Sequence, residues 1–180
     1  MFSYEEKTKM RGSVDLKLYG PDGELKETRY IPNLVVNVGK NYIATRMLGT
    51  TTQTATATTA TLTSCMTHMA IGTGTTTVAV GDTSLAVEVS ATGDITQYFR
   101  APLTTTTQSA NVITYVALFG TSNPNRSNSS NTTEITEAGI FNSSSSTGTL
   151  TGTMLCRTTF NVVNKGNDDT LQITWTITVS

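Results

Sequence analysis

The residues best suited to proton transfer form no recognisable catalytic pattern. His68 is the chain's one histidine, and histidine is the side chain whose ordinary pKa suits proton transfer near neutral pH. It alternates with Met66 and Ala70 on a predicted strand, without an acidic partner or a serine nucleophile in a known motif. Paired carboxylates could cleave a glycosidic bond, yet nothing singles out two of those after residue 50: Asp82, Glu88, Asp94, Glu134, Glu137, Asp168 and Asp169. The sequence therefore predicts no catalytic residue and no enzyme.

Metal and cofactor sites are also not predicted. Asn167-Asp168-Asp169 offers oxygen ligands for calcium, but a turn rich in Asn and Asp explains this segment, and calcium takes more ligands than one turn supplies. Gly72-Thr73-Gly74 lacks the lysine, the third glycine and the helix of a nucleotide-binding loop. Cys65 and Cys156 are 91 positions apart in a chain without a secretion signal, so we expect buried free thiols.

Charge argues against nucleic acid and membrane partners. The net charge is -1, and the eight Lys and Arg residues among the first 46 positions are interspersed with six acidic residues. Phosphate binding needs a basic surface, and these charges nearly cancel. No apolar run reaches the length of a membrane span, and the first residues lack a signal-peptide core. We therefore expect a soluble chain made in the cytosol, with no nucleic acid and no membrane as partner.

Composition favours an all-β fold. Only 14% of the 180 residues are charged, and 39 are threonine. Threonine fits a pleated sheet surface and is a weak helix former. A chain of this length can bury a sizeable core as one domain without disulfides.

The N-terminal part is predicted to contain a short set of elements. Residues 1–12 are expected to form an extended arm, and residues 13–49 a β-hairpin, with its turn at Gly20-Pro21-Asp22-Gly23, followed by a short helix from Asn37 to about Leu48. Residues 50–64, rich in Thr and Ala, are expected to be a loop. A second part, residues 65–180, would follow.

Alternating strands dominate that second part. We predict hairpins from segments 95–105 and 112–119, from 134–141 and 150–160, and from the last of these to 171–179 through a turn at residues 164–169. The final strand alternates apolar Leu171, Ile173, Trp175, Ile177 and Val179 with polar residues. These strands predict an antiparallel β-sandwich, jelly-roll or immunoglobulin-like, preceded by the arm, hairpin and helix.

Three segments together resemble virion proteins of tailed bacteriophages. They are Met66-Thr67-His68-Met69-Ala70-Ile71-Gly72-Thr73-Gly74, Thr83-Ser84-Leu85-Ala86-Val87-Glu88 and Ile135-Thr136-Glu137-Ala138-Gly139-Ile140-Phe141. The resemblance covers roughly residues 12–180 and implies a capsid decoration or cement protein. Tail-collar fibre proteins share a similar pattern, but there it precedes a shaft. The ordered terminal strand, with no shaft after it, favours the stand-alone capsid role over a tail, neck or fibre component.

The resemblance implies the partners as well. They would be the major capsid protein and further copies of this chain, in a dimer or trimer on the outer capsid surface of a virion made in a bacterial host. Arm, hairpin and helix would bind the capsid or a neighbouring copy. A carbohydrate-binding module is a lesser alternative, since sandwiches often carry such sites. The candidate interface residues are Tyr4, Lys7, Lys9, Arg11, Tyr30, Ile31, Met47 and Leu48.

Overall fold

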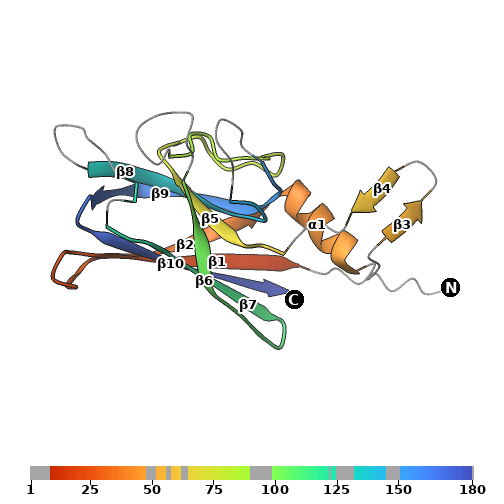
Figure 1. Ribbon diagram of the computed structural model, residues 1–180, viewed down its shortest axis with the longest axis horizontal. Helices are drawn as coiled ribbons and strands as arrows, with labels where there is room; N and C mark the ends of the chain where they lie inside the picture. Colours follow the sequence, from red (N-terminus) through yellow and green to blue (C-terminus); the bar gives the residue numbers. More distant parts are fainter. Residues whose placement is uncertain are drawn as a thin grey trace.

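The computed structural model describes residues 9–47, 52–55, 58–61, 65–89, 99–121, 123–124, 132–144 and 151–179. The elements in these residues are β1 (Met10–Tyr19), β2 (Leu25–Val35), α1 (Asn37–Met47), β3 (Thr52–Ala55), β4 (Thr58–Thr61), β5 (His68–Gly72), β6 (Arg100–Ser109), β7 (Val112–Phe119), β8 (Thr132–Phe141), β9 (Met154–Gly166) and β10 (Thr170–Val179). The all-β class and the one short helix are as the sequence indicates (Figure 1).

Eight of these strands close into an antiparallel barrel in the order β1-β10-β7-β6-β5-β8-β9-β2. The predicted open sandwich, whether jelly-roll or immunoglobulin-like, is therefore wrong. Closure depends on two strands. β2 pairs with β1 and, at Leu34 and Val35, also with β9. β6 pairs with β5 through Arg100–Pro102 and with β7 from Leu103 onward, with a register shift between Leu103 and Thr105. Each strand thus bends from one wall into the other and leaves no free edge.

The alternating strands fill the barrel interior. β10 buries its apolar residues against the inward residues of β1, in the register Val14 opposite Trp175 and Leu16 opposite Ile173. The predicted half-buried terminal strand is confirmed, and its outward threonines line the wall. Residues almost wholly removed from solvent on several strands complete one core: Leu16, Met69, Ile71, Phe119, Ile135, Ile140, Leu171 and Trp175.

Two of the three hairpins predicted in the second part are confirmed, and one is wrong. β6 and β7 pair around a turn at Ala110, and β8 pairs with β9. A tight turn does join β9 to β10, but the neighbours of β10 are β1 and β7. The chain crosses there between opposite walls of the barrel. The same residue types form a turn between two paired strands and a turn between opposite walls. The sequence of this turn therefore could not reveal that the chain crosses the barrel.

The N-terminal part also differs from the predicted division. The predicted hairpin is present, but β1 and β2 are barrel strands, so the boundary at residues 50–64 does not separate them from the rest. Of the predicted arm, residues 1–8 lie outside the described residues, and β1 already begins at Met10.

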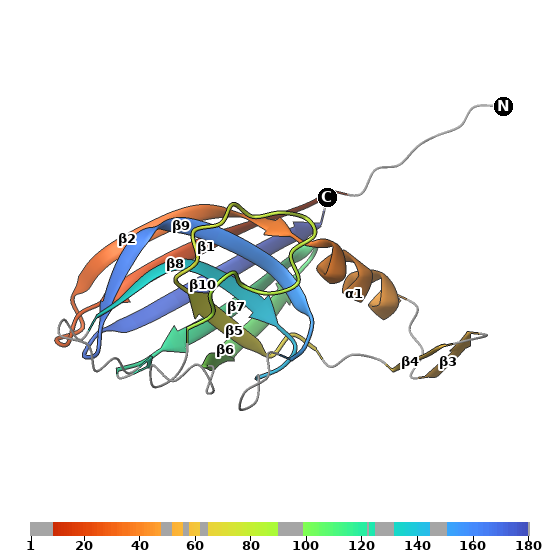
Figure 2. The same cartoon turned by 90° about the horizontal axis from the view of Figure 1, so that it is seen from above.

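Helix α1 follows β2 at one end of the barrel, and β3 and β4 form a separate two-stranded sheet beyond it (Figure 2). That sheet occurs where a loop is predicted. The helix packs closely on β9, because a side-chain Cβ at Gly39 would lie 2.0 Å from the carbonyl oxygen of Leu155. Glycine is therefore required there by the approach of two backbones.

Candidate interaction surface

Residues 73–89, here called the wall loop, lie against the outside of β8 and β9 (Figures 1 and 2). Apart from a bridge between Gly72 and Glu88, the loop contains no helix or strand. Its Leu85 inserts into a small apolar cluster that includes Ala70, Phe141 and Met154. This cluster lies apart from the main core and attaches the loop to the barrel.

Glu137 on β8 binds the backbone of the wall loop at two places. Its Oε1 accepts hydrogen bonds from the amides of Gly74 at 3.0 Å and Val87 at 2.8 Å, and its Oε2 accepts one from Ala86 at 3.0 Å. The Glu137 residue is 0% exposed. One buried carboxylate therefore joins the beginning of the loop to its end through Oε1, and its second oxygen also binds the Ala86 amide.

Arg157 on β9 supplies the countercharge and further contacts. Its Nε donates to Glu137 at 2.8 Å, its Nη1 to Asp82 at 2.8 Å and its Nη2 to the carbonyl of Thr76 at 3.0 Å. Burial alone would raise the pKa of Asp82, but the Ala79 amide and the Arg157 guanidinium outweigh it and lower that pKa. Burial likewise opposes the charged form of Arg157, whose pKa is nevertheless raised by Asp82 and Glu137. Both groups are held charged.

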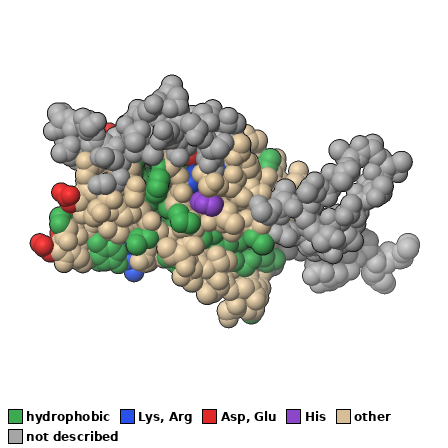
Figure 3. Space-filling model, in the orientation of Figure 1, with side chains coloured by type: hydrophobic (Ala, Val, Ile, Leu, Met, Phe, Trp, Pro, Cys, Tyr) green, Lys and Arg blue, Asp and Glu red, His purple; other side chains and the backbone are tan. Residues whose placement is uncertain are grey.

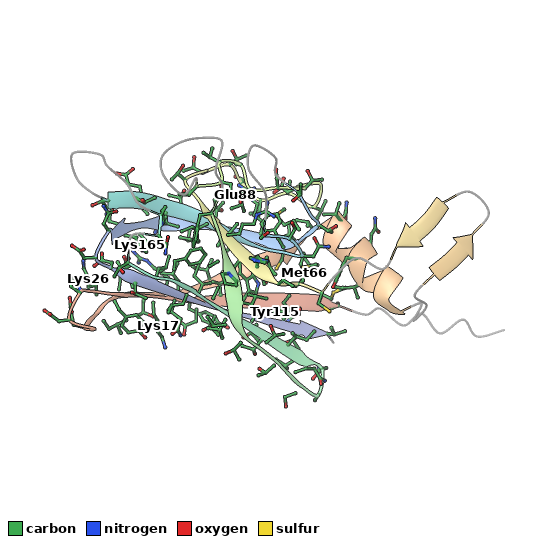
Figure 4. The ribbon with its side chains drawn as sticks, viewed as in Figure 1. Lys17, Lys26, Met66, Glu88, Tyr115 and Lys165 are labelled. Carbon is green, nitrogen blue, oxygen red and sulfur yellow. The ribbon has the colours of Figure 1, made fainter. Side chains whose placement is uncertain are left out.

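A second buried pair fixes the end of the wall loop. Arg100 on β6 donates to both carboxylate oxygens of Glu88, at 2.8 and 3.0 Å, and its Nη1 reaches the carbonyls of Ser143 and Thr151. The guanidinium also stacks on the ring of Phe141, with its carbon 3.7 Å from the ring centroid. Burial raises the pKa of Glu88 despite the opposing effect of Arg100. Figure 4 shows Glu88 beside β5, on the side of the wall loop.

The three segments that carry the phage resemblance meet at these anchors. The first contains β5 and Gly74, the second contains Glu88, and the third is the part of β8 with Glu137. Their arginine partners, Arg100 and Arg157, were missed by sequence reasoning. The available signal was their occurrence in a part of the chain that has only four basic residues after position 50.

The anchored loop exposes apolar side chains to solvent. Val80 is 47% exposed and Val87 is 54% exposed, and the amide of Val87 is itself bound by Glu137. Figure 3 shows that charged side chains are sparse on the face it displays. The wall loop therefore presents apolar side chains on a backbone that buried ion pairs hold in place, and such a surface is suited to binding another macromolecule. The buried glutamates already bind arginines and amides within the chain.

The predicted interface residues lie in several places. Tyr4, Lys7 and Leu48 fall outside the described residues, and Met47 is the last residue of α1. Ile31 is half-buried and packs against the barrel core. Lys9, Arg11 and Tyr30 are exposed.

Two of these residues lie together on the opposite wall from the wall loop. Arg11 and Tyr30 line a shallow groove of about 310 Å³ across β2, β1 and β10, here called the β1 groove. Its floor and sides are otherwise formed by Gly12, Ser13, Pro32, Thr176 and Thr178. Tyr30 is 79% exposed. An aromatic ring, a cation and several hydroxyl groups therefore share one open surface.

Burial lowers the pKa of two other ionisable groups, His68 and Lys165. His68 lies on β5, where partial burial and the nearby Arg100 lower its pKa, and its Nδ1 is 2.8 Å from the Thr67 hydroxyl. Lys165 on β9 is buried near the barrel end opposite α1, where its Nζ donates to the carbonyl of Gly120 at 2.9 Å (Figure 4). Burial lowers the pKa of Lys165 to about 8, against the opposing effect of Asp169.

Within the described ranges, no group of three or more His, Cys, Asp or Glu residues is placed to hold a metal ion. In the same ranges, no helix has the length and apolarity needed to cross a membrane. Cys156 is buried as expected, whereas Cys65 is exposed, so the expected burial of Cys65 is wrong.

Comparison with protein-family models, with curated proteins and with solved structures gave no match to this chain.

Proposed function

We propose that this chain is a structural virion protein of the capsid-decoration type, which binds the outer capsid surface and stabilises contacts between capsomers. The observation that supports this role is the wall loop, whose exposed Val80 and Val87 are carried on a backbone anchored by Glu137 and Glu88. A surface ordered before binding loses less conformational entropy when it docks. It suits a protein that must make the same contact many times on one particle.

The phage resemblance supports the same proposal from a different direction. The segments that carry it build the anchors of the wall loop, so the resemblance falls on the part of the molecule that we assign to docking. A dimer or trimer would add strength, because the second contact of a docked oligomer is effectively intramolecular. The proposed partners are thus the major capsid protein and further copies of this chain.

The test uses expanded phage heads assembled without this protein. We expect the purified chain to sediment with the heads and to raise the temperature at which they rupture. Val80→Asp and Val87→Asp should each weaken this binding, because a docked carboxylate would lose its water without gaining a partner. Leu118→Asp is the matched control, since Leu118 is 45% exposed and lies on β7, away from the wall loop.

Two results would contradict the proposal. One is a folded chain that neither binds nor stabilises the heads. The other is an electron-microscopy location on the tail, neck or fibre, which would assign the chain to the alternative virion role. If the valine variants bound the heads as well as the wild type does, the wall loop would not be part of the contact with the capsid.

A further inference from the structure

The β1 groove contains two polar groups without partners in the described part of the chain. No hydrogen bond or ion pair from described residues reaches the guanidinium of Arg11 or the hydroxyl of Tyr30. Both side chains face solvent. The groove therefore offers a cation and an aromatic ring to a ligand that brings a carboxylate and apolar surface.

The register of the strands sets the spacing of these groups. Pro32 lies opposite Ser13, Tyr30 opposite Asp15 and Arg11 opposite Thr178. Tyr30, Pro32 and Arg11 therefore occupy three successive outward rows across the groove. A strand rises about 3.3 Å per residue, so neighbouring rows are ~7 Å apart.

Residues 1–8, which lie outside the described residues, carry a matching pattern. Alternate residues of an extended chain share one face, which places Phe2, Tyr4 and Glu6 together at the same ~7 Å spacing. Along this face the side chains are aromatic, aromatic and acidic. Laid along the groove, they would place Phe2 at Tyr30, Tyr4 at Pro32 and Glu6 at Arg11.

We propose that the N-terminal residues 1–8 of a second copy of this chain bind in the β1 groove, and that two copies exchange these segments reciprocally. The segment of the same copy is poorly placed to do so. β1 runs from Met10, opposite Val179, into the groove at Arg11 and Ser13. Filling its own groove would require a reversal within Thr8 and Lys9.

The direction of the pairing fits a two-fold axis. With Glu6 at Arg11 and Phe2 deeper, at Tyr30, the incoming segment leaves the groove at the end where β1 begins. The host's own segment leaves at the same end and enters the partner in the same way. Such a reciprocal contact is the form that a symmetric dimer takes. The inference rests on the proposed homo-oligomer and specifies how it is held.

The first test measures oligomeric mass by sedimentation equilibrium on the full chain and on a chain lacking residues 2–8. We expect a dimer and a monomer, respectively. The deletion should leave the barrel folded, as circular dichroism will check, because β1 begins at Met10. A monomeric full chain, or a truncated chain that is still dimeric, would overturn the proposal.

Charge reversal tests the pairing itself. Arg11→Glu and Glu6→Arg should each weaken dimerisation by about tenfold, because each brings like charges together, and the double variant should regain most of the loss. Lys17→Glu is the control, since Lys17 is a cation on the same strand outside the groove and faces Asp15 at 3.4 Å. Failure of the double variant to recover would contradict the Glu6–Arg11 contact.

A synthetic peptide of residues 1–8 gives a third readout. It should bind the truncated chain and shift the amide signals of Thr176 and Thr178 in nuclear magnetic resonance spectra, and Tyr30→Ala should weaken it. Binding of an oligogalacturonate in place of the peptide would overturn the proposal in favour of a glycan. A monomeric full chain that still coats phage heads would also overturn it while leaving the capsid proposal intact.

Discussion

Glu137 on β8 and Arg157 on β9 form a salt bridge of 2.8 Å in which neither side chain is more than 2% exposed. The pair lies between the barrel wall and the wall loop. Glu137 also accepts hydrogen bonds from three backbone amides of that loop. Buried ion pairs usually offset their own desolvation only when further hydrogen bonds satisfy both partners. Here those bonds come from the loop, so the pair and the loop depend on each other.

Replacing the anchor should release the wall loop. Glu137→Gln loses the charge that faces Arg157 and one of the two acceptor oxygens, and we expect it to lower the free energy of unfolding by about 3–5 kcal/mol. Hydrogen exchange should show lost protection at Gly74, Ala86 and Val87. Glu134→Gln, on the same strand but exposed, is the control. Unchanged protection at the three amides would show that the loop does not depend on Glu137.

The Glu88–Arg100 pair should show strong coupling. Glu88→Gln leaves the Arg100 guanidinium buried without a countercharge, and we expect a loss of about 3 kcal/mol in the free energy of unfolding. Glu88→Gln with Arg100→Met should cost less than the sum of the single variants, by about 1–3 kcal/mol. Urea unfolding of all four chains gives this coupling energy. Additive effects would mean that the bidentate contact contributes nothing to stability.

Lys165 should make stability depend on alkaline pH. Burial lowers the pKa of Lys165 from its ordinary 10.5 to about 8. Between these pH values the unfolded chain binds more protons than the folded chain, so this group makes the free energy of unfolding rise with pH. Below about pH 8 both states hold the proton and the unfavourable contribution of burial is constant.

Lys165→Met removes this dependence. The wild type should therefore gain up to about 3 kcal/mol relative to the variant between pH 8 and pH 10.5. Urea unfolding at pH 7, 8, 9 and 10 measures the difference. Lys40→Met is the control, because Lys40 is an exposed lysine on α1, away from Lys165 and Asp169. Parallel pH profiles for wild type and Lys165→Met would contradict the shifted pKa.

Gly39→Ala should be destabilising, contrary to the usual effect in a helix interior. Alanine normally favours a helix over glycine by about 1 kcal/mol. At this position the new Cβ would meet the Leu155 carbonyl at 2.0 Å, so α1 must move away from β9, and we expect a loss of about 1–3 kcal/mol. Thermal unfolding measures it, with the exposed Lys40→Ala on the same helix as control. A stabilised Gly39→Ala variant would show that the helix is not docked on β9.

Much of the local structure could be predicted from the chain's own pattern. Alternation predicts β10 and the inward positions of β1, because adjacent strand residues face opposite sides. The turn at residues 20–23 and the helix after Val36 follow from residue types that favour a turn and a cap. Such signals act between near neighbours, so they need no knowledge of the rest of the fold.

The candidate site could be predicted only in part. The segments with Glu88 and Glu137 were singled out by resemblance, but their arginine partners were not, since Arg100 and Arg157 are 12 and 20 positions away in sequence. Arg11 and Tyr30 were expected at an interface, and their juxtaposition in one groove depends on the pairing of β1 with β2.

The sequence by itself determined an all-β chain with a half-buried terminal strand, because composition and two-residue periodicity act locally. Tertiary structure alone decided that β2 and β6 bend to close a barrel, that β10 pairs with β1 in place of β9, and that two glutamates are buried against two arginines. The physical reason is that an inward-facing residue has the same alternating pattern in a sandwich and in a barrel. Which strand lies beside it is set by contacts between distant segments, and those contacts also decide whether a charged side chain becomes an anchor.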